Sequence, residues 1–526
     1  MKKIKFSAGM VLGTLFFFPS VVLANNLTIT NVSLEDRDQT ANTIVVEFDI
    51  SWDSSWRNET NHDAVWVVLK ALKNGSNFHL AGVMKDSGVN PSGTSTGSSN
   101  AQLEIVVPSD KTGAFIRRKE SGTGNITAKN VRLVLWYEGS PLSAVSTDTL
   151  VVKVLGYEMV YIPTAPFYAG DFGTSTASFK QTNSGTQPWY ISAEDAITTT
   201  TAALGAWYYT SGGNTGENAS NTVFTIPAAF PKGYSAFYCM KYEVTEGEWL
   251  DFFNSINSIV KAARDITATK GDSVTQRGTL SWSSGDATIT RPDRVLNYMQ
   301  WMDLAVFLDW IALRPMTELE YEKISRGPLM PVASEYAWGS TAITGATTIS
   351  LSPETGEETI STASANANYN VSTFSGGDSS QGAQYQNGPL RAGIFGTGTS
   401  TRVTSGAGYY GVMEMSGNVF EFAVSAGQTL GRSFTGTHGD GVYTTGTNGA
   451  TMCRVCATNT DWPSDSALSQ GAGVDSVEGS GLRGGAYNQA AAILAVSDRT
   501  LAAFPWSNAF GARTSRQGGR GVRTAP

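Results

Sequence analysis

Helical patterns are confined to a short middle part of this 526-residue chain, and this most limits the fold that the chain can adopt. Two of the helices have clear starting points. Thr245 and Thr317 are each followed three residues later by a glutamate, Glu248 or Glu320. A threonine and a glutamate at this spacing form a capping box, in which each side chain binds a backbone N–H group at the start of the helix. The sequence therefore predicts helices that begin directly after Thr245 and Thr317.

The apolar surfaces of the predicted helices indicate how they pack. The stretch "RVLNYMQWMDLAVFLDWIAL" follows Pro292 and is apolar on a wide face, which predicts a well-buried third helix. The helix after Thr245 has a core-facing stripe at helical spacing, formed by Trp249, Phe252, Phe253, Ile256 and Val260. The remaining sequence is rich in glycine, with 56 residues, and carries short strand patterns between loops. A few helices beside many short strands predict an α+β fold.

Residues 25–155 carry strand patterns without helical ones. Runs such as "NTIVVEFDISW", "VWVVLKAL" and "VRLVLWYEG" are rich in β-branched residues and are separated by clusters of Gly, Ser, Asn and Pro. Strands at this spacing predict an all-β, sandwich-like domain. His62 lies in the polar stretch "NETNHDA", where a solvated loop residue is expected rather than a catalytic one.

The first 24 residues have the pattern of a secretory signal peptide. Three lysines precede an apolar run that ends at Ala24, where cleavage is expected. No later stretch approaches the roughly 20 apolar residues that span a bilayer. We therefore expect a mature chain without a membrane span that is secreted, periplasmic or at the cell surface. The net charge of −8 argues against a nucleic-acid partner, because binding to nucleic acid needs a basic face.

The three cysteines are Cys239, Cys453 and Cys456, and the last two form a CxxC pattern. This pattern is compatible with a redox pair, half of a zinc site or a local disulfide. The chain has no second CxxC and only three histidines, which disfavours zinc. A structural or incidental pair is the favoured interpretation.

The second unit, residues 157–526, holds a low-complexity insertion near 173–221 and a series of motifs in fixed order. The motifs are "MVYIPTAPFYAGD", "FYCMKYEVTEGEWLDFFN", "LNYMQWMDLAVFLDW", "RPMTELEYEKISRG", "YAWGS", "GVMEMSGNVFEF", "LRGGAYN" and "GGRGVRTA". This series closely resembles the sulfatase-modifying, formylglycine-generating enzyme family. The resemblance implies that family's C-type-lectin-like fold for this unit. The expected fold class is thus α+β, with a C-type-lectin-like C-terminal domain preceded by the all-β sandwich-like domain.

The resemblance also implies a structural calcium ion near "MEMSGNVFEF". The matching ligands are the Glu421 carboxylate and the backbone carbonyls of Glu414, Gly417 and Val419, and such hard oxygen ligands suit calcium. The alternative is that Glu421 only binds backbone amides in the core. The carboxylates of "RPMTELEYE" are attributed to helix capping and the helix dipole rather than to acid–base chemistry.

The segment from Arg483 to Arg523 decides between an enzyme and a binding protein. The family's enzymes oxidise a substrate cysteine to formylglycine with two neighbouring, copper-binding cysteines in this segment, and copper requires such soft thiolates. Here the segment contains no cysteine. Copper is therefore not expected, and a non-enzymatic member of the family is favoured. The alternative is a formylglycine-generating-type oxidase or other family enzyme with an altered site, for which Cys453 and Cys456 are the available thiols.

Residues from about Ala486 to Gly518 are predicted to form a ligand-binding surface. Large aromatic residues stand there among small and polar ones, a composition typical of adaptable contact surfaces. A protein or glycan ligand is expected. The residues predicted to contact it are Tyr487, Asn488, Leu501, Phe504, Trp506, Asn508 and Phe510.

The end of the chain also resembles the variable proteins of diversity-generating retroelements. Their ligand-facing residues are randomised at adenines, so the resemblance implies a sequence-diversified surface. Gln489, Trp506 and Gln517 do not arise from such codons and would be fixed positions. A purely structural role in a surface layer or in adhesion is the remaining alternative.

Overall fold

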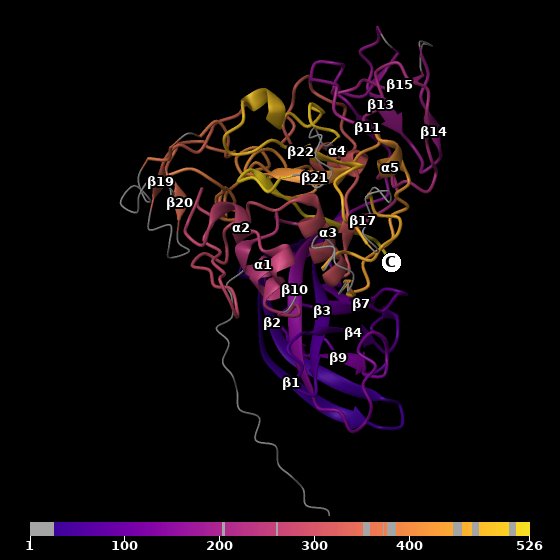
Figure 1. Ribbon diagram of the computed structural model, residues 1–526, viewed down its shortest axis with the longest axis vertical. Coiled ribbons are helices and arrows are strands. Elements are labelled where there is room, and N and C mark those ends of the chain that lie inside the picture. Colours follow the sequence, from indigo (N-terminus) through magenta and orange to yellow (C-terminus); the bar gives the residue numbers. More distant parts are fainter. Residues whose placement is uncertain are drawn as a thin grey trace, which may run out of the picture.

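The computed structural model describes residues 26–526 except 183, 202–205, 259–260, 351–357, 372, 376–385, 445–454, 465–472 and 504–511. A strand-rich N-terminal region lies at one end of the molecule, and a loop-rich C-terminal region with the helices lies at the other (Figure 1). The predicted signal peptide falls outside the described residues. Among the described helices, none has the length and hydropathy to cross a membrane.

The N-terminal region consists of strands, as the sequence predicts. They are β1 (Thr28–Asp38), β2 (Thr43–Arg57), β3 (Asp63–Lys73), β4 (Leu80–Met84), β5 (Gly88–Val89), β6 (Ser98–Ser99), β7 (Leu103–Val107), β8 (Ala114–Arg118), β9 (Gly122–Trp136) and β10 (Leu150–Ile162). The main path of hydrogen-bonded strands runs β1-β2-β9-β4-β3-β10. Every pair along this path is antiparallel.

Strand β3 is buried on both faces because it lies between two apolar cores. Val65 and Val67 belong to the core of the N-terminal region, together with Phe48 of β2. Trp66 and Val68, on the opposite face, belong to the large core that contains the helices. Since both faces of β3 are covered, its sequence reads as a nearly continuous apolar run rather than as an alternating one.

The sheet of the N-terminal region continues into the C-terminal region. From β10 the path runs on through β17 (Phe237–Met240), β24 (Gly521–Thr524) and β18 (Arg314–Pro315). Strand β10 crosses the boundary expected at 155–157, because it pairs with β3 from Leu150 to Val160 and with β17 from Met159 to Ile162. The two regions therefore share one sheet.

The C-terminal region holds the described helices and many short strands. The helices are α1 (Glu246–Phe253), α2 (Thr267–Lys270), α3 (Trp301–Trp310), α4 (Glu318–Arg326) and α5 (Thr429–Arg432). The other strands are β11 (Phe167–Ala169), β12 (Lys180–Gln181), β13 (Trp189–Ile191), β14 (Ile197–Thr198), β15 (Trp207–Tyr208), β16 (Thr225–Ile226), β19 (Ile349–Ser350), β20 (Thr359–Ile360), β21 (Phe420–Val424), β22 (Ser480–Arg483) and β23 (Gln517–Gly518). Together these elements make the chain α+β.

The helix starts were predicted well in two cases and wrongly in one. Both capping boxes are formed, with Thr245 at the N-terminus of α1 and Thr317 at that of α4. Helix α3 begins only at Trp301, although the apolar pattern starts soon after Pro292. Gln300 is extended and forms a capping box with Asp303, which fixes the helix start at this point. The apolar residues before Gln300 are buried in irregular, non-helical backbone, in which Tyr298 has a positive φ of 61°.

The segment at 173–221 is better packed than a long surface loop. Its described residues form β12, β13, β14 and β15, and each of these pairs with a neighbouring short strand. Phe179 and Trp189 are fully buried in the large core, with ring centroids 4.4 Å apart. Aromatic residues within a polar composition therefore anchor this segment.

His62 is buried rather than solvated, which corrects the sequence-based expectation. Its ring stacks on Tyr161, and Nε2 lies 3.0 Å from the Tyr238 hydroxyl. The neighbouring Asn61 donates a hydrogen bond of 2.6 Å to the carbonyl of Tyr410. Asn58 to Thr60 of the polar turn are exposed, but its end at Asn61 and His62 is covered because the C-terminal region packs against it.

Candidate functional site

The segment from Arg483 to Arg523 is fixed at both ends to β21. Strand β22, which ends at Arg483, is antiparallel to β21, and β23 is parallel to its other edge. In this register Glu421 lies opposite both Arg483 and Gly518. A 3-10 turn over Ala491–Leu494 lies between the two strands in the sequence. The segment is therefore held as a loop platform over a three-stranded sheet.

Two arginines connect this segment to helix α4 through buried ion pairs. Arg483 contacts Glu318 at 3.1 Å and Glu322 at 2.9 Å. Arg499 donates from Nε to Glu318 at 2.7 Å and from Nη2 to the other carboxylate oxygen at 3.2 Å. All four side chains are at most 1% exposed. Arg499 pairs with Glu318 rather than with its neighbour Asp498, whose carboxylate accepts hydrogen bonds from Thr500.

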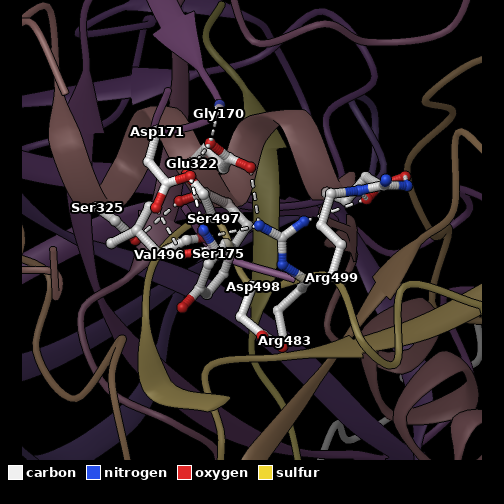
Figure 2. A network of polar contacts seen from close by, with 12 residues as sticks. Gly170, Asp171, Ser175, Glu322, Ser325, Arg483, Val496, Ser497, Asp498 and Arg499 are labelled. Atoms are coloured by element: carbon white, nitrogen blue, oxygen red, sulfur yellow. Dashed lines mark hydrogen bonds and ion pairs between the residues drawn. The ribbon is translucent and has the colours of Figure 1, made fainter. Parts of the chain in front are cut away.

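Glu322 lies at the centre of this network (Figure 2). It accepts hydrogen bonds from the Gly170 N–H group at 2.7 Å and the Ser497 hydroxyl at 3.1 Å, beside its contacts with Arg483 and Arg326. Burial opposes its ionisation, but Arg483 and Arg326 outweigh this effect and hold the pKa of Glu322 below its ordinary value. The carboxylate of Glu322 is thus a charged part of the scaffold at neutral pH.

The carboxylates of α4 therefore serve structure, as the sequence indicates. Glu320 completes the capping box of Thr317 and also pairs with Arg314 at 2.6 Å and 2.9 Å. Glu318 accepts a further hydrogen bond of 2.8 Å from the N–H group of Ala426. Each of the three carboxylates, Glu318, Glu320 and Glu322, is paired with at least one arginine.

Glu421 binds an arginine, which neither of the two interpretations from the sequence included. The Arg520 guanidinium contacts both of its carboxylate oxygens, from Nε at 2.6 Å and from Nη2 at 2.8 Å. Both side chains are fully buried. Burial alone would lower the pKa of Arg520, but the attraction of Glu421 outweighs it and raises that pKa. The two charges are a bidentate buried pair.

The residues around Glu421 do not fit a calcium ion, because the positive charge of Arg520 already occupies this position. The N–H groups of two other residues matched to calcium hold this loop in place, since Val419 donates to Glu243 and Gly417 donates to the carbonyl of Gly484. Glu414 accepts a hydrogen bond from Gly393 through Oε1. The described residues contain no group of three or more acidic, histidine or cysteine side chains suited to a metal ion.

The residues predicted to contact a ligand have different environments. Asn488 is exposed and Leu501 is half-buried. Tyr487 is only 1% exposed, and its hydroxyl lies 2.9 Å from that of Ser515. Tyr487 therefore supports the platform from within, in contrast to the exposed position expected for it. Four further predicted contacts lie outside the described residues, and they are Phe504, Trp506, Asn508 and Phe510.

Neither of the two described cysteines has an exposed free thiol. Cys456 is disulfide-bonded, as expected for a structural pair. Cys239 is free but fully buried in β17, and burial raises the pKa of its thiol. Cys453 lies outside the described residues.

Sequence reasoning missed the arginine pairs that hold the segment, although a signal for them exists. From Arg483 to Arg523 there are six arginines and a single acid, Asp498. Such an excess of charge in a segment that packs into the core requires carboxylates from elsewhere. The structure supplies Glu318 and Glu322 from α4 and Glu421 from β21. Asp303 and Asp110 supply the partners of Arg513 and Arg523.

Residues 196–524 match the family described as the Sulfatase-modifying factor enzyme 1-like domain. The matched part covers well over half of the 526 residues. It contains all described helices, strand β21 and the segment from Arg483 to Arg523. No curated protein matches the chain significantly.

Proposed function

Because the chain belongs to the Sulfatase-modifying factor enzyme 1-like family, we propose that it is a non-enzymatic member that binds a protein or glycan ligand. The loops between Ala486 and Gly518 form the contact surface. The domain that carries them has the C-type-lectin-like fold, and the N-terminal strands form a sandwich-like support. The signal-peptide pattern supports export of the chain to the periplasm, the cell surface or the medium.

The observation that carries this proposal is the use of charge in the segment from Arg483 to Arg523. The segment has no cysteine and no histidine, and its one acid is hydrogen-bonded to Thr500. Five of its six arginines form ion pairs with carboxylates of other segments. These groups stabilise a platform. They provide no nucleophile and no general base for a reaction.

The platform presents small and polar side chains to solvent. Asn488, Ala490 and Ala492 are exposed, and Gln489 and Ile493 are half-buried. Below them, Tyr487 donates its backbone N–H group to Asn418, and the N–H group of Val371 binds the Tyr487 carbonyl. A rigid backbone with exposed side chains suits a contact surface whose residues vary, as sequence diversification would require.

The binding surface is tested with two probes, a glycan array and a phage-displayed peptide library. Asn488→Arg combined with Ala492→Arg places two large cations on the platform. We expect the variant to bind the selected glycan or peptide at least about tenfold more weakly than wild type, since long charged side chains obstruct a fitted contact. Val145→Arg is the matched control, because Val145 is 52% exposed in the N-terminal region. Equal binding by the double variant and wild type would contradict the assigned surface.

The alternative function, a family oxidase with an altered site, predicts a different result. Wild type is incubated with copper and a cysteine-containing sulfatase peptide, and the peptide is examined by mass spectrometry and with an aldehyde-reactive probe. We expect the peptide to keep its thiol. Formation of an aldehyde would refute the non-enzymatic proposal, and its loss in Cys453→Ser/Cys456→Ser would assign the reaction to these thiols.

A further inference from the structure

The guanidinium group of Arg520 is enclosed by oxygen atoms in the core of the C-terminal region. Nε and Nη2 bind the two oxygens of Glu421. Nη1 binds the carbonyls of Met240 and Lys241, each at 3.2 Å, and Nη2 also binds the carbonyl of Met413 at 2.8 Å. A guanidinium has five N–H groups, so these five contacts use its full donor capacity. We call this set of oxygens, from Glu421, Met240, Lys241 and Met413, the oxygen cage.

The oxygen cage has the composition of a site for a hard cation. It combines one carboxylate with three backbone carbonyls, which are the ligand types that calcium uses in proteins. Its oxygens come from β21, the end of β17 and the loop before β21, so the fold itself holds them together. Backbone carbonyls that converge in a buried place require a donor or a cation. In this chain the guanidinium supplies both charge and hydrogen bonds.

Further acidic groups surround the oxygen cage. Glu243 is fully buried and close enough to interact electrostatically with both Glu421 and Arg520. Glu414 is 6% exposed and also interacts with Arg520, and its Oε2 accepts no hydrogen bond from the described residues. Without Arg520 the carboxylate of Glu421 and the converging carbonyls would remain without a cation, and the negative charge of this part of the core would be uncompensated. Such an arrangement favours the uptake of a cation.

We propose that Arg520 is the resident cation of the oxygen cage and takes the place of a calcium ion there. The C-terminal region then folds without calcium at this position. Removal of the guanidinium leaves the carboxylate and carbonyls in place and converts the cage into a calcium site. Arg520 thus makes the stability of this region independent of the calcium concentration around the protein.

The test compares thermal unfolding of the full chain in EDTA and in millimolar calcium, together with calorimetric titration of calcium. For wild type we expect the same Tm in both solutions and no binding heat. Arg520→Ala is expected to have a lower Tm in EDTA, and this Tm should rise with calcium concentration, because a ligand that binds only the folded state stabilises it. Arg516→Ala is the matched control, since Arg516 lies in the same segment and is half-exposed. Its Tm should not respond to calcium.

Two results would overturn the proposal. One is stoichiometric calcium binding by wild type that Glu421→Gln abolishes, since the cage would then hold the metal beside Arg520. The other is a folded Arg520→Ala variant whose Tm is the same with and without calcium. If Arg520→Ala does not fold, Arg520→Lys keeps the charge with fewer hydrogen bonds. We expect Arg520→Lys to fold with a lower Tm that does not respond to calcium, and a calcium-dependent Tm in this variant would count against the proposal.

Discussion

Strands β2 and β9 of the N-terminal region and the segment from Arg483 to Arg523 use charged residues in opposite ways. On β2 the apolar residues alternate toward the core, and Glu47 on the outer face pairs with Arg132 of β9 at 2.6 Å. Arg132 is 39% exposed, so this pair is wet. In the C-terminal segment Arg499 and Arg520 are fully buried with their carboxylate partners.

This difference shows that buried charges determine where the C-terminal segment lies on the rest of the protein. A buried ion must have a partner, because an isolated buried charge is very costly. Each buried arginine therefore fixes the segment to one place, Arg499 to Glu318 of α4 and Arg520 to Glu421 of β21. In the N-terminal region the burial of apolar side chains holds the strands in place, and the charges on its surface are replaceable.

The largest effect is expected when one buried partner is removed. Arg499→Met leaves the shared carboxylate of Glu318 with one arginine and frees the carbonyls of Ala177 and Thr210. We expect a loss of about 3–5 kcal/mol in the free energy of unfolding, measured by urea unfolding with tryptophan fluorescence. Arg516→Met, in the same segment but half-exposed, should unfold close to wild type. A loss in Arg499→Met as small as in this control would show that the buried pair does not hold the segment.

An intermediate effect is expected from His62, which lies where the two regions meet. Burial, and secondarily the charges of Arg117 and Arg57, lower the pKa of His62 from 6.5 to about 3. The unfolded chain therefore binds a proton on this residue below pH 6.5 that the folded chain excludes. The contribution of His62 to the free energy of unfolding is therefore fully present above pH 6.5. It falls as the pH falls toward 3, by up to about 1.4 kcal/mol per pH unit.

His62→Gln is expected to remove this part of the acid sensitivity. The glutamine amide can still bind the Tyr238 hydroxyl but does not titrate. Urea unfolding at a series of pH values from neutral to mildly acidic should give a shallower slope for the variant than for wild type. An unchanged slope would mean that His62 is protonated in the folded protein.

The smallest effect is expected on the surface of the N-terminal region. Arg132→Met removes the contacts with Glu47 and with Asp36, which is 67% exposed. Exposed ion pairs contribute little because water and salt screen them. The midpoint of urea unfolding should stay close to that of wild type, at low and at high salt. A large, salt-dependent shift would remove the contrast between the two regions.

Local features of the fold could be predicted from the sequence, and distant pairings could not. The capping boxes at Thr245 and Thr317 and the strands before residue 155 depend on residues a few positions apart, and the structure has them. The start of α3 was misplaced because apolar spacing does not separate a buried helix from a buried irregular segment, and the cap by Gln300 and Asp303 determines where the helix begins.

The candidate site shows the same limit more strongly. The burial of Tyr487 and the partner of Glu421 both depend on where the chain returns to β21. Arg520 is 99 residues from Glu421, and Arg499 is 181 residues from Glu318. No local pattern specifies such pairs. What the sequence did predict is the capping role of Glu320, whereas the arginine partners of Glu318 and Glu322 could not be read from it.

Because the two regions share one sheet, the protein cannot be shortened at the boundary of the family match without exposing a strand edge. Residues 196–524 match the family, yet β17 within them is paired on one side by β10, which lies outside that range. A fragment that begins at residue 196 would expose the N–H and C=O groups of Phe237–Met240 as an open edge, and open edges pair with other chains. We therefore expect that residues 196–524 do not fold as a self-contained domain. A shortened form that is to stay monomeric must keep β10 and also β3, which pairs with the other edge of β10.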